Sequence, residues 1–247
     1  MLSKIKFTKM TCFTFLTLIT IMFSFTVKLS AEDLNLTYKD HTKVMEFTLQ
    51  HQSDIVKWMK NRNIRKKPSN NEILQFLAKI SNTRTTYDIH LAIVESININ
   101  NKNRSKRLKR ELNQRVNSII SKVKMAKSIQ KLKSLLSNEI TKTRGENDSL
   151  AVGIKIAQQI LQDGIQHNIY SVNTLKKYSP TKGFWSDAYH HAKDSIVGHL
   201  KDDVKGAIIG GVIGGGIPGA IGGAIKESTG SVGGAIWDML THPTPAY

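Results

Sequence analysis

Apolar residues recur every three or four positions along most of the chain between residues 41 and 166. This spacing predicts amphipathic helices, because residues three and four apart lie on one face of a helix. No segment shows the sustained alternation of apolar and polar residues that a half-buried strand requires. The sequence therefore predicts an all-α fold. Helices are expected over residues 41–60, from a cap at Asn70 or Asn71 to Ile80, and over residues 86–97, 105–144 and 150–166.

The predicted helical region at 105–144 contains neither glycine nor proline. Its apolar residues follow steps of four, four, three, four and three, which is close to a heptad. One long helix, or two helices divided near Ser128, would fit this pattern. The apolar seam consists of Leu108, Leu112, Val116, Ile119, Val123 and Ala126.

Glycine divides the chain sharply. None of the 17 glycines precedes Gly145, and 12 of them fall between Gly206 and Gly234. Residues 206–225 form a 20-residue segment without a charged or hydrogen-bonding side chain. As one helix, this segment would span about 30 Å, the thickness of a hydrocarbon core. So many glycines destabilise a helix in water, at about 1 kcal/mol each relative to alanine. In a bilayer, however, the backbone must satisfy its own hydrogen bonds.

The glycines of this segment are also regularly spaced, in two ladders with steps of four residues. Such GxxxG ladders form a flat surface on which two helix backbones approach closely. Pro218 lies within the segment and predicts a kink or a turn. A glycine-rich hairpin buried in a soluble core is the alternative to a membrane helix. The predicted helix-packing positions are Gly206, Gly210 and Gly214 in one ladder, and Gly211, Gly215, Gly219 and Gly223 in the other.

Residues 184–204, which precede the glycine-rich segment, have the apolar spacing of an amphipathic helix. Phe184, Trp185 and Trp237 bracket the segment. Aromatic side chains of this kind favour the interface between water and lipid, although each could also be a core residue. We therefore expect these three residues at a membrane interface.

With these features, residues 184–240 resemble the glycine-zipper region of membrane-active bacteriocins. The resemblance covers about a quarter of the chain and implies that the seven ladder glycines are helix-contact positions in a target membrane. The chain departs from that family because it carries a secretory type of N-terminus and about 150 intervening residues. No family is recognised over residues 32–182.

The N-terminal 31 residues have the order of an export signal. Lys4, Lys6 and Lys9 precede the uncharged stretch 12–27, and Ala31 offers a small residue for cleavage before Glu32. An uncleaved signal-anchor is the alternative. The expected organisation is a signal over residues 1–31, a basic helical domain over 32–178, a linker over 179–183, and a membrane-active segment over 184–247. We expect the protein to be secreted or to lie in the cell envelope.

The chain is strongly basic, with 36 lysines and arginines against 19 acidic residues and a formal net charge of +17. Between Lys102 and Lys133 there are 12 basic residues and one acidic residue. This predicts an anionic membrane surface as the partner. The alternative is a solvated helix face that binds no partner. Nucleic acid is disfavoured, because the run contains no aromatic residue for stacking.

The sequence predicts no catalytic, cofactor or metal site. Its single cysteine, Cys12, lies in the predicted signal, and there is no GxSxG, HExxH or phosphate-loop motif. His190, His191 and His199 cluster with Asp187 and Asp194, but their spacing favours a solvated polar face over a metal site.

Two functional hypotheses follow for a non-enzymatic, exported protein. One is a bacteriocin-like effector, whose glycine zipper inserts and associates in a bilayer. The alternative is an envelope-anchored structural or interaction protein, which uses the zipper to form homo-oligomers.

Overall fold

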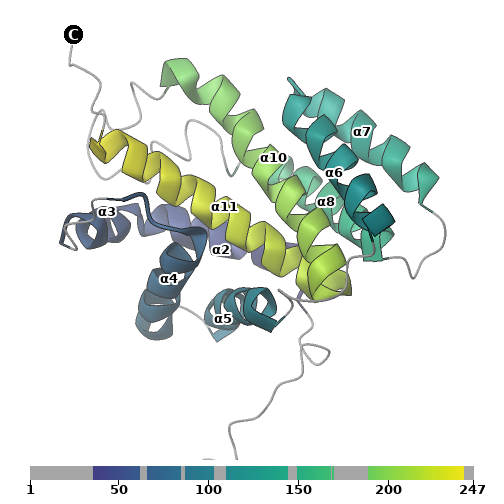
Figure 1. The fold of residues 1–247 in the computed structure, drawn as a ribbon. Coiled ribbons are helices and arrows are strands. Elements are labelled where there is room, and N and C mark those ends of the chain that lie inside the picture. The colour runs from purple at the N-terminus through teal and green to yellow at the C-terminus, as the bar shows by residue number, and fades with distance from the viewer. Residues whose placement is uncertain are drawn as a thin grey trace, which may run out of the picture. The chain divides into compact units, whose positions relative to one another are not determined.

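Nine α-helices and no strand make up the regular structure of the residues that the computed structural model describes (Figure 1). These residues are 36–61, 66–84, 87–102, 110–143, 149–167, 169 and 189–241. The all-α prediction is confirmed for them. The helices are α2 (Tyr38–Gln50), α3 (Gln52–Asn61), α4 (Asn70–Arg84), α5 (Tyr87–Lys102), α6 (Arg110–Met125), α7 (Ile129–Lys142), α8 (Ser149–Gln166), α10 (Tyr189–Gly214) and α11 (Gly216–Thr241).

The chain divides into two compact units, Met1–Leu34 and Asn35–Tyr247. The predicted signal lies in the first unit, outside the described residues. The predicted linker and the two aromatic residues Phe184 and Trp185 also lie outside them.

Helix boundaries follow from local capping. The helix expected over residues 41–60 is divided at His51, which has a non-helical backbone and closes the last turn of α2. The cap predicted at Asn70 or Asn71 is instead Ser69: its hydroxyl accepts from the backbone N–H of Glu72, whose carboxylate accepts from the N–H of Ser69. This reciprocal pair is a capping box, which satisfies two N–H groups at the helix start.

The region expected over 105–144 forms two helices, α6 and α7. Ser128 has an extended backbone, and its hydroxyl accepts a hydrogen bond from the backbone N–H of Lys131 at 3.2 Å. A serine in this position begins a new helix, because it satisfies a donor that the first turn leaves open. The seam residues Val116, Ile119, Val123 and Ala126 are buried, as the spacing indicated.

Helix α11 lies at the centre of the unit. It packs against α10, α8 and the N-terminal helices α2 to α5, and Figure 1 shows it in yellow along the green α10. Its residues are buried from Gly219 to Ile225 and again from Ser228 to Gly230. Two further glycines, Gly230 and Gly233, let α4 approach closely, since an added Cβ would meet the side chains of Asn70 and Ile73 respectively. The core is therefore built around the glycine-rich part of the sequence.

Among the described residues, we find no helix with both the length and the apolarity needed to cross a membrane.

Candidate functional site

Helices α10 and α11 form a hairpin whose arms touch backbone to backbone. A Cβ added at Gly206 would lie 2.8 Å from the Cα of Ala224, and one added at Gly210 would lie 2.8 Å from the Cα of Gly223. In the other direction, a Cβ on Gly219 would lie 2.5 Å from the carbonyl oxygen of Gly210. Real side chains do not tolerate such distances, so these positions require glycine. The contacts are antiparallel and centred on the turn between the two helices.

A second glycine contact joins the same arm to α8. A Cβ added at Gly211 would lie 2.6 Å from the Cα of Gly153, and one added at Gly153 would lie 3.1 Å from the carbonyl oxygen of Ile208. Thus α10 is closely packed on two sides, with one glycine face toward α11 and another toward α8. Gly153 was not among the predicted positions, because it stands alone in α8 rather than in a ladder.

Gly215 departs from the predicted ladder. Its φ of 77° and the φ of 73° at Gly216 place both residues in the left-handed region, and a Cβ on either would meet nothing within 4 Å. Gly215 therefore reverses the chain and does not pack against a helix. The four-residue spacing from Gly211 through Gly215 to Gly219 is interrupted at this turn, so these glycines do not share one helix face. Gly214 does approach the other arm, since its Cα would lie 2.8 Å from a Cβ on Gly219.

Pro218 lies in the first turn of α11, just after the reversal. A proline is tolerated there, because the first backbone N–H groups of a helix have no partner within the helix. The break that Pro218 predicted therefore occurs two to three residues earlier, at the glycines.

The tip of the hairpin is apolar and exposed. Ile213 and Ile217 flank the reversal and are 40% and 48% exposed. Away from the tip the arms are buried, and Ala207, Ile208, Ile221 and Ile225 have no exposed surface. Trp237, which was expected at a membrane interface, is partly buried near the end of α11.

A buried polar cluster links the hairpin to α2. The hydroxyl of Ser228 in α11 donates to Asp203 in α10 and lies 2.9 Å from Nε2 of His41 in α2. Nε2 of His41 is also 3.7 Å from the carboxylate of Asp203, and all three side chains are fully buried. The cluster therefore ties both arms of the hairpin to the N-terminal helices.

The cluster holds a serine, a histidine and an aspartate, but it differs from a catalytic triad. In a triad, the carboxylate binds Nδ1 of the histidine, while Nε2 faces the serine. Here both oxygen atoms lie on the Nε2 side, and the buried Nδ1 of His41 has no hydrogen-bond partner among the described residues. With no exposed surface, the serine is also inaccessible to a substrate.

Two further polar contacts between the arms lie next to this cluster. Nδ1 of His199 is 2.8 Å from the hydroxyl of Ser231, and Lys205 pairs with Glu227 at 2.7 Å between the two arms. Burial lowers the pKa of His199, although the charge of Asp203 partly opposes this effect. His199 is thus a buried residue and does not lie on the solvated polar face that its spacing indicated.

The side chains of His190, His191 and Asp194 lie outside the described set, and so does Asp187. Within the described part of the chain, no group of three or more histidine, cysteine or acidic residues could hold a metal ion.

The described residues therefore form an all-helical unit built around an apolar hairpin. The two arms of this hairpin are in contact through glycines, and buried polar side chains join them to α2. Comparison with protein-family models, with curated proteins and with solved structures finds no significant match to this chain.

Proposed function

We propose that this chain is an exported, membrane-active, bacteriocin-like protein that keeps its membrane-entering segment folded as a hairpin inside a helical bundle. The observation that carries the proposal is the uncharged segment 206–225, which reverses at Gly215 and exposes Ile213 and Ile217 at its tip. An exposed apolar tip is a natural first contact with the bilayer, because burying it in lipid removes apolar surface from water.

Full insertion requires the segment to leave the bundle. Each arm contributes about ten uncharged residues, or about 15 Å of helix, whereas the straightened segment would span about 30 Å. Insertion therefore breaks the contacts of α10 and α11 with their neighbours and opens the turn. In lipid, the loss of the turn removes the need for left-handed backbone at Gly215 and Gly216.

The buried cluster of His41, Asp203 and Ser228 supports this proposal, because its contacts must break before the hairpin can leave the bundle. Asp203 and Ser228 lie outside the uncharged segment, one on each side; in the bundle Ser228 is 2.9 Å from Nε2 of His41 and donates a hydrogen bond to Asp203. A charged or polar group of this kind is costly in lipid. Together with Lys205 and Lys226, which directly flank the uncharged segment, these two residues limit how much of the hairpin can enter lipid.

Opening of the hairpin would also release its glycines. In the bundle, Gly206, Gly210, Gly219 and Gly223 are in contact within one chain. Once separated, the same flat surfaces could pair with another copy, as GxxxG faces do in membranes. We therefore propose that homo-oligomers, if they form through the ladder, form after insertion.

The test is release of a trapped dye from anionic vesicles by the mature chain and by Ile217→Asp. Because Ile217 is about half exposed, the variant should fold as well as the unaltered chain. Moving the charge into lipid costs about 3 kcal/mol, which corresponds to about a hundredfold loss of leakage activity.

Gln75→Asp is the matched control, since it introduces the same charge at an exposed position of α4. It should leak dye like the unaltered protein. If Ile217→Asp also leaks fully, the tip does not enter the bilayer. If the unaltered chain releases no dye, the membrane-active function itself is refuted.

A further inference from the structure

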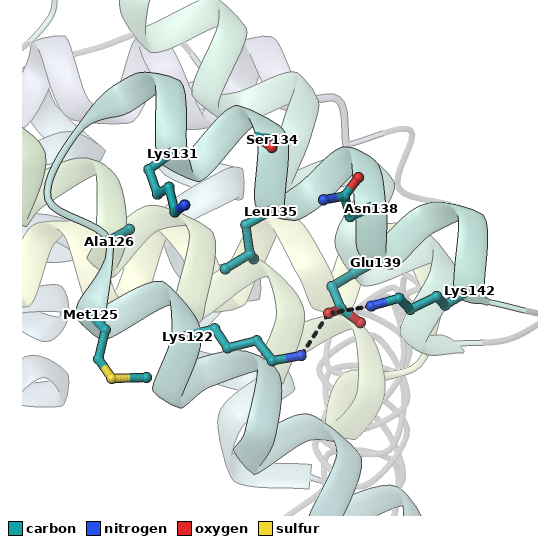
Figure 2. Close-up of a pocket in the computed structure, with 9 residues that line it drawn as sticks. All are labelled: Lys122, Met125, Ala126, Lys131, Ser134, Leu135, Asn138, Glu139 and Lys142. Atoms are coloured by element: carbon teal, nitrogen blue, oxygen red, sulfur yellow. Dashed lines mark hydrogen bonds and ion pairs between the residues drawn. The ribbon is translucent and has the colours of Figure 1, made fainter.

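A groove lies between α6 and α7, and the buried cluster of His41, Asp203 and Ser228 is not part of its lining. It has a volume of about 360 Å³. Figure 2 shows its lining side chains, which come from the last turn of α6, from Ala126 directly after it, and from one face of α7. Three lysines, two apolar side chains and an amide dominate it: Lys122, Lys131, Lys142, Met125, Leu135 and Asn138.

The groove carries net positive charge. Its one acidic residue, Glu139, pairs with Lys122 at 2.8 Å and with Lys142 at 3.5 Å. Burial alone would raise the pKa of Glu139, but the hydrogen bond and charge of Lys122, and then those of Lys142, hold it below its ordinary value. Glu139 is therefore ionised at neutral pH and neutralises one of three cations. Lys131 has no ion-pair partner among the described residues and is exposed.

The groove also exposes an apolar side chain. Met125 is 67% exposed, more than any other large hydrophobic residue in the described part of the chain. The exposed Lys124 and Lys127 stand on either side of it in the sequence. A thioether amid long cationic side chains can enter the acyl boundary while the ammonium groups remain at the headgroups.

The wider surface has the same character. Residues 110–143 contain eight basic and two acidic residues and no aromatic residue. The lack of aromatic residues disfavours single-stranded nucleic acid, which needs stacking platforms. A phospholipid with an anionic headgroup matches both features of the groove, because it offers a phosphate to the lysines and an apolar layer to Met125.

From this complementarity we infer that the α6–α7 groove binds the headgroups of anionic phospholipids and docks the bundle on the membrane before the hairpin inserts. The inference rests on the proposed function and adds the docking surface to it. Docking and insertion then use different parts of the chain: a cationic groove that stays folded and an apolar hairpin that unfolds from the bundle.

The test compares two double variants of the mature chain in binding to vesicles of phosphatidylglycerol and phosphatidylcholine. K131Q/K142Q removes two groove charges but keeps the Lys122–Glu139 pair. K39Q/K79Q removes two exposed charges from α2 and α4 and so has the same net charge. Each lysine at an anionic surface contributes about fivefold in affinity, so the groove variant should bind about twenty-five-fold more weakly. The control should change by less than about twofold.

Met125→Ser tests the apolar half of the groove and should weaken binding by about tenfold. All variants are first compared with the unaltered chain in thermal unfolding, since a shared loss of fold would mimic lost docking. Binding of the unaltered chain should fall in 0.5 M salt and on pure phosphatidylcholine.

Equal weakening by the two double variants would overturn the groove, because net charge alone would then explain binding. Unchanged binding of K131Q/K142Q would overturn it too. In both cases dye release by the unaltered chain would still support the proposed function, so the two failures are distinguishable.

Discussion

The α10–α11 hairpin and the α6–α7 pair are held together in opposite ways. In the hairpin the contact is between backbones, since Gly206 and Gly210 face Gly223 and Gly219 without side chains between them. In the α6–α7 pair, the helices are separated by a groove lined with long side chains, and Lys122 reaches Glu139 across it. The contact between the hairpin arms depends on the absence of side chains at these glycines and does not tolerate an added Cβ. The contact between α6 and α7 is made by long side chains, of which Lys122 is partly exposed and Glu139 is buried, and the lysines on its rim can be replaced without a steric clash.

This difference fits the two proposed roles. A segment that has to leave the bundle is held by close backbone contacts, by buried apolar side chains and by a few buried polar groups, so it leaves only when these contacts break together. A surface that has to bind headgroups presents long, solvated side chains and remains folded. The predictions below test this contrast, beginning with the change expected to have the largest effect.

Gly210→Ala should strongly destabilise the bundle. The added methyl group would lie 2.8 Å from the Cα of Gly223 and would also meet the carbonyl of Gly219. Forcing the arms apart costs about 3 kcal/mol, which exceeds the gain of about 1 kcal/mol in helix propensity. Urea unfolding measures the loss. Gly198→Ala is the control, because a Cβ there meets nothing within 4 Å; it should be neutral or stabilising. Similar losses in both variants would contradict the backbone contact.

Gly215→Ala should destabilise the bundle by about 1–2 kcal/mol through backbone strain alone, since its Cβ would meet no atom. Because Gly216 also has a positive φ, Gly216→Ala should behave in the same way. If one change already opens the turn, the double variant should be little less stable than either single variant. In lipid, where we propose a straightened helix, both should be harmless. Stability toward urea should therefore fall while dye release is maintained, and a parallel loss of both would count against straightening.

Only part of this structure follows from local sequence patterns. The helical segments from α2 to α8 were predictable, because apolar spacing is a local property, but the division at His51 was not predicted and the division near Ser128 was only one of two alternatives. The glycine spacing indicated close helix contacts but could not identify the partners, since Gly211 meets Gly153 of a distant helix. The place of the reversal depends on the positive φ at Gly215, which any glycine can adopt. The cluster of His41, Asp203 and Ser228 joins residues up to 187 positions apart, and no local pattern reports such a contact.

Ser128→Ala should affect only the α6–α7 side. It removes the hydroxyl that caps α7 and should cost about 1 kcal/mol. Hydrogen exchange should quicken in the first turn of α7, while α10 and α11 keep their protection. Ser121→Ala, at an exposed position of α6, should have almost no effect. Equal loss of protection in the hairpin would show that the two regions unfold together rather than separately.

The smallest expected effect concerns pH and the hairpin alone. Because burial lowers the pKa of His199, the unfolded chain binds more protons below about pH 6.5 than the folded chain does. The contribution of His199 to stability is thus complete above that pH and is lost as the pH falls.

Asp202 acts in the opposite sense. Burial raises its pKa, and Asp203 and Glu227 add to this, while Ser231 and Lys205 oppose it. The folded chain therefore binds more protons than the unfolded chain above the ordinary value of 3.8, so acidification stabilises it through this group. The two effects partly cancel, which makes the net slope shallow.

Urea midpoints between pH 7 and pH 4.5 separate the two groups. His199→Gln should lose less stability on acidification than the unaltered chain, whereas Asp202→Asn should lose more. The two variants therefore diverge from the unaltered chain in opposite directions, although neither slope is large. Identical slopes for all three proteins would show that neither buried group titrates with unfolding. A steeper loss of stability with falling pH in His199→Gln would contradict the burial of that imidazole between the two arms of the hairpin. The α10–α11 hairpin would then not differ from the α6–α7 pair in having buried polar groups.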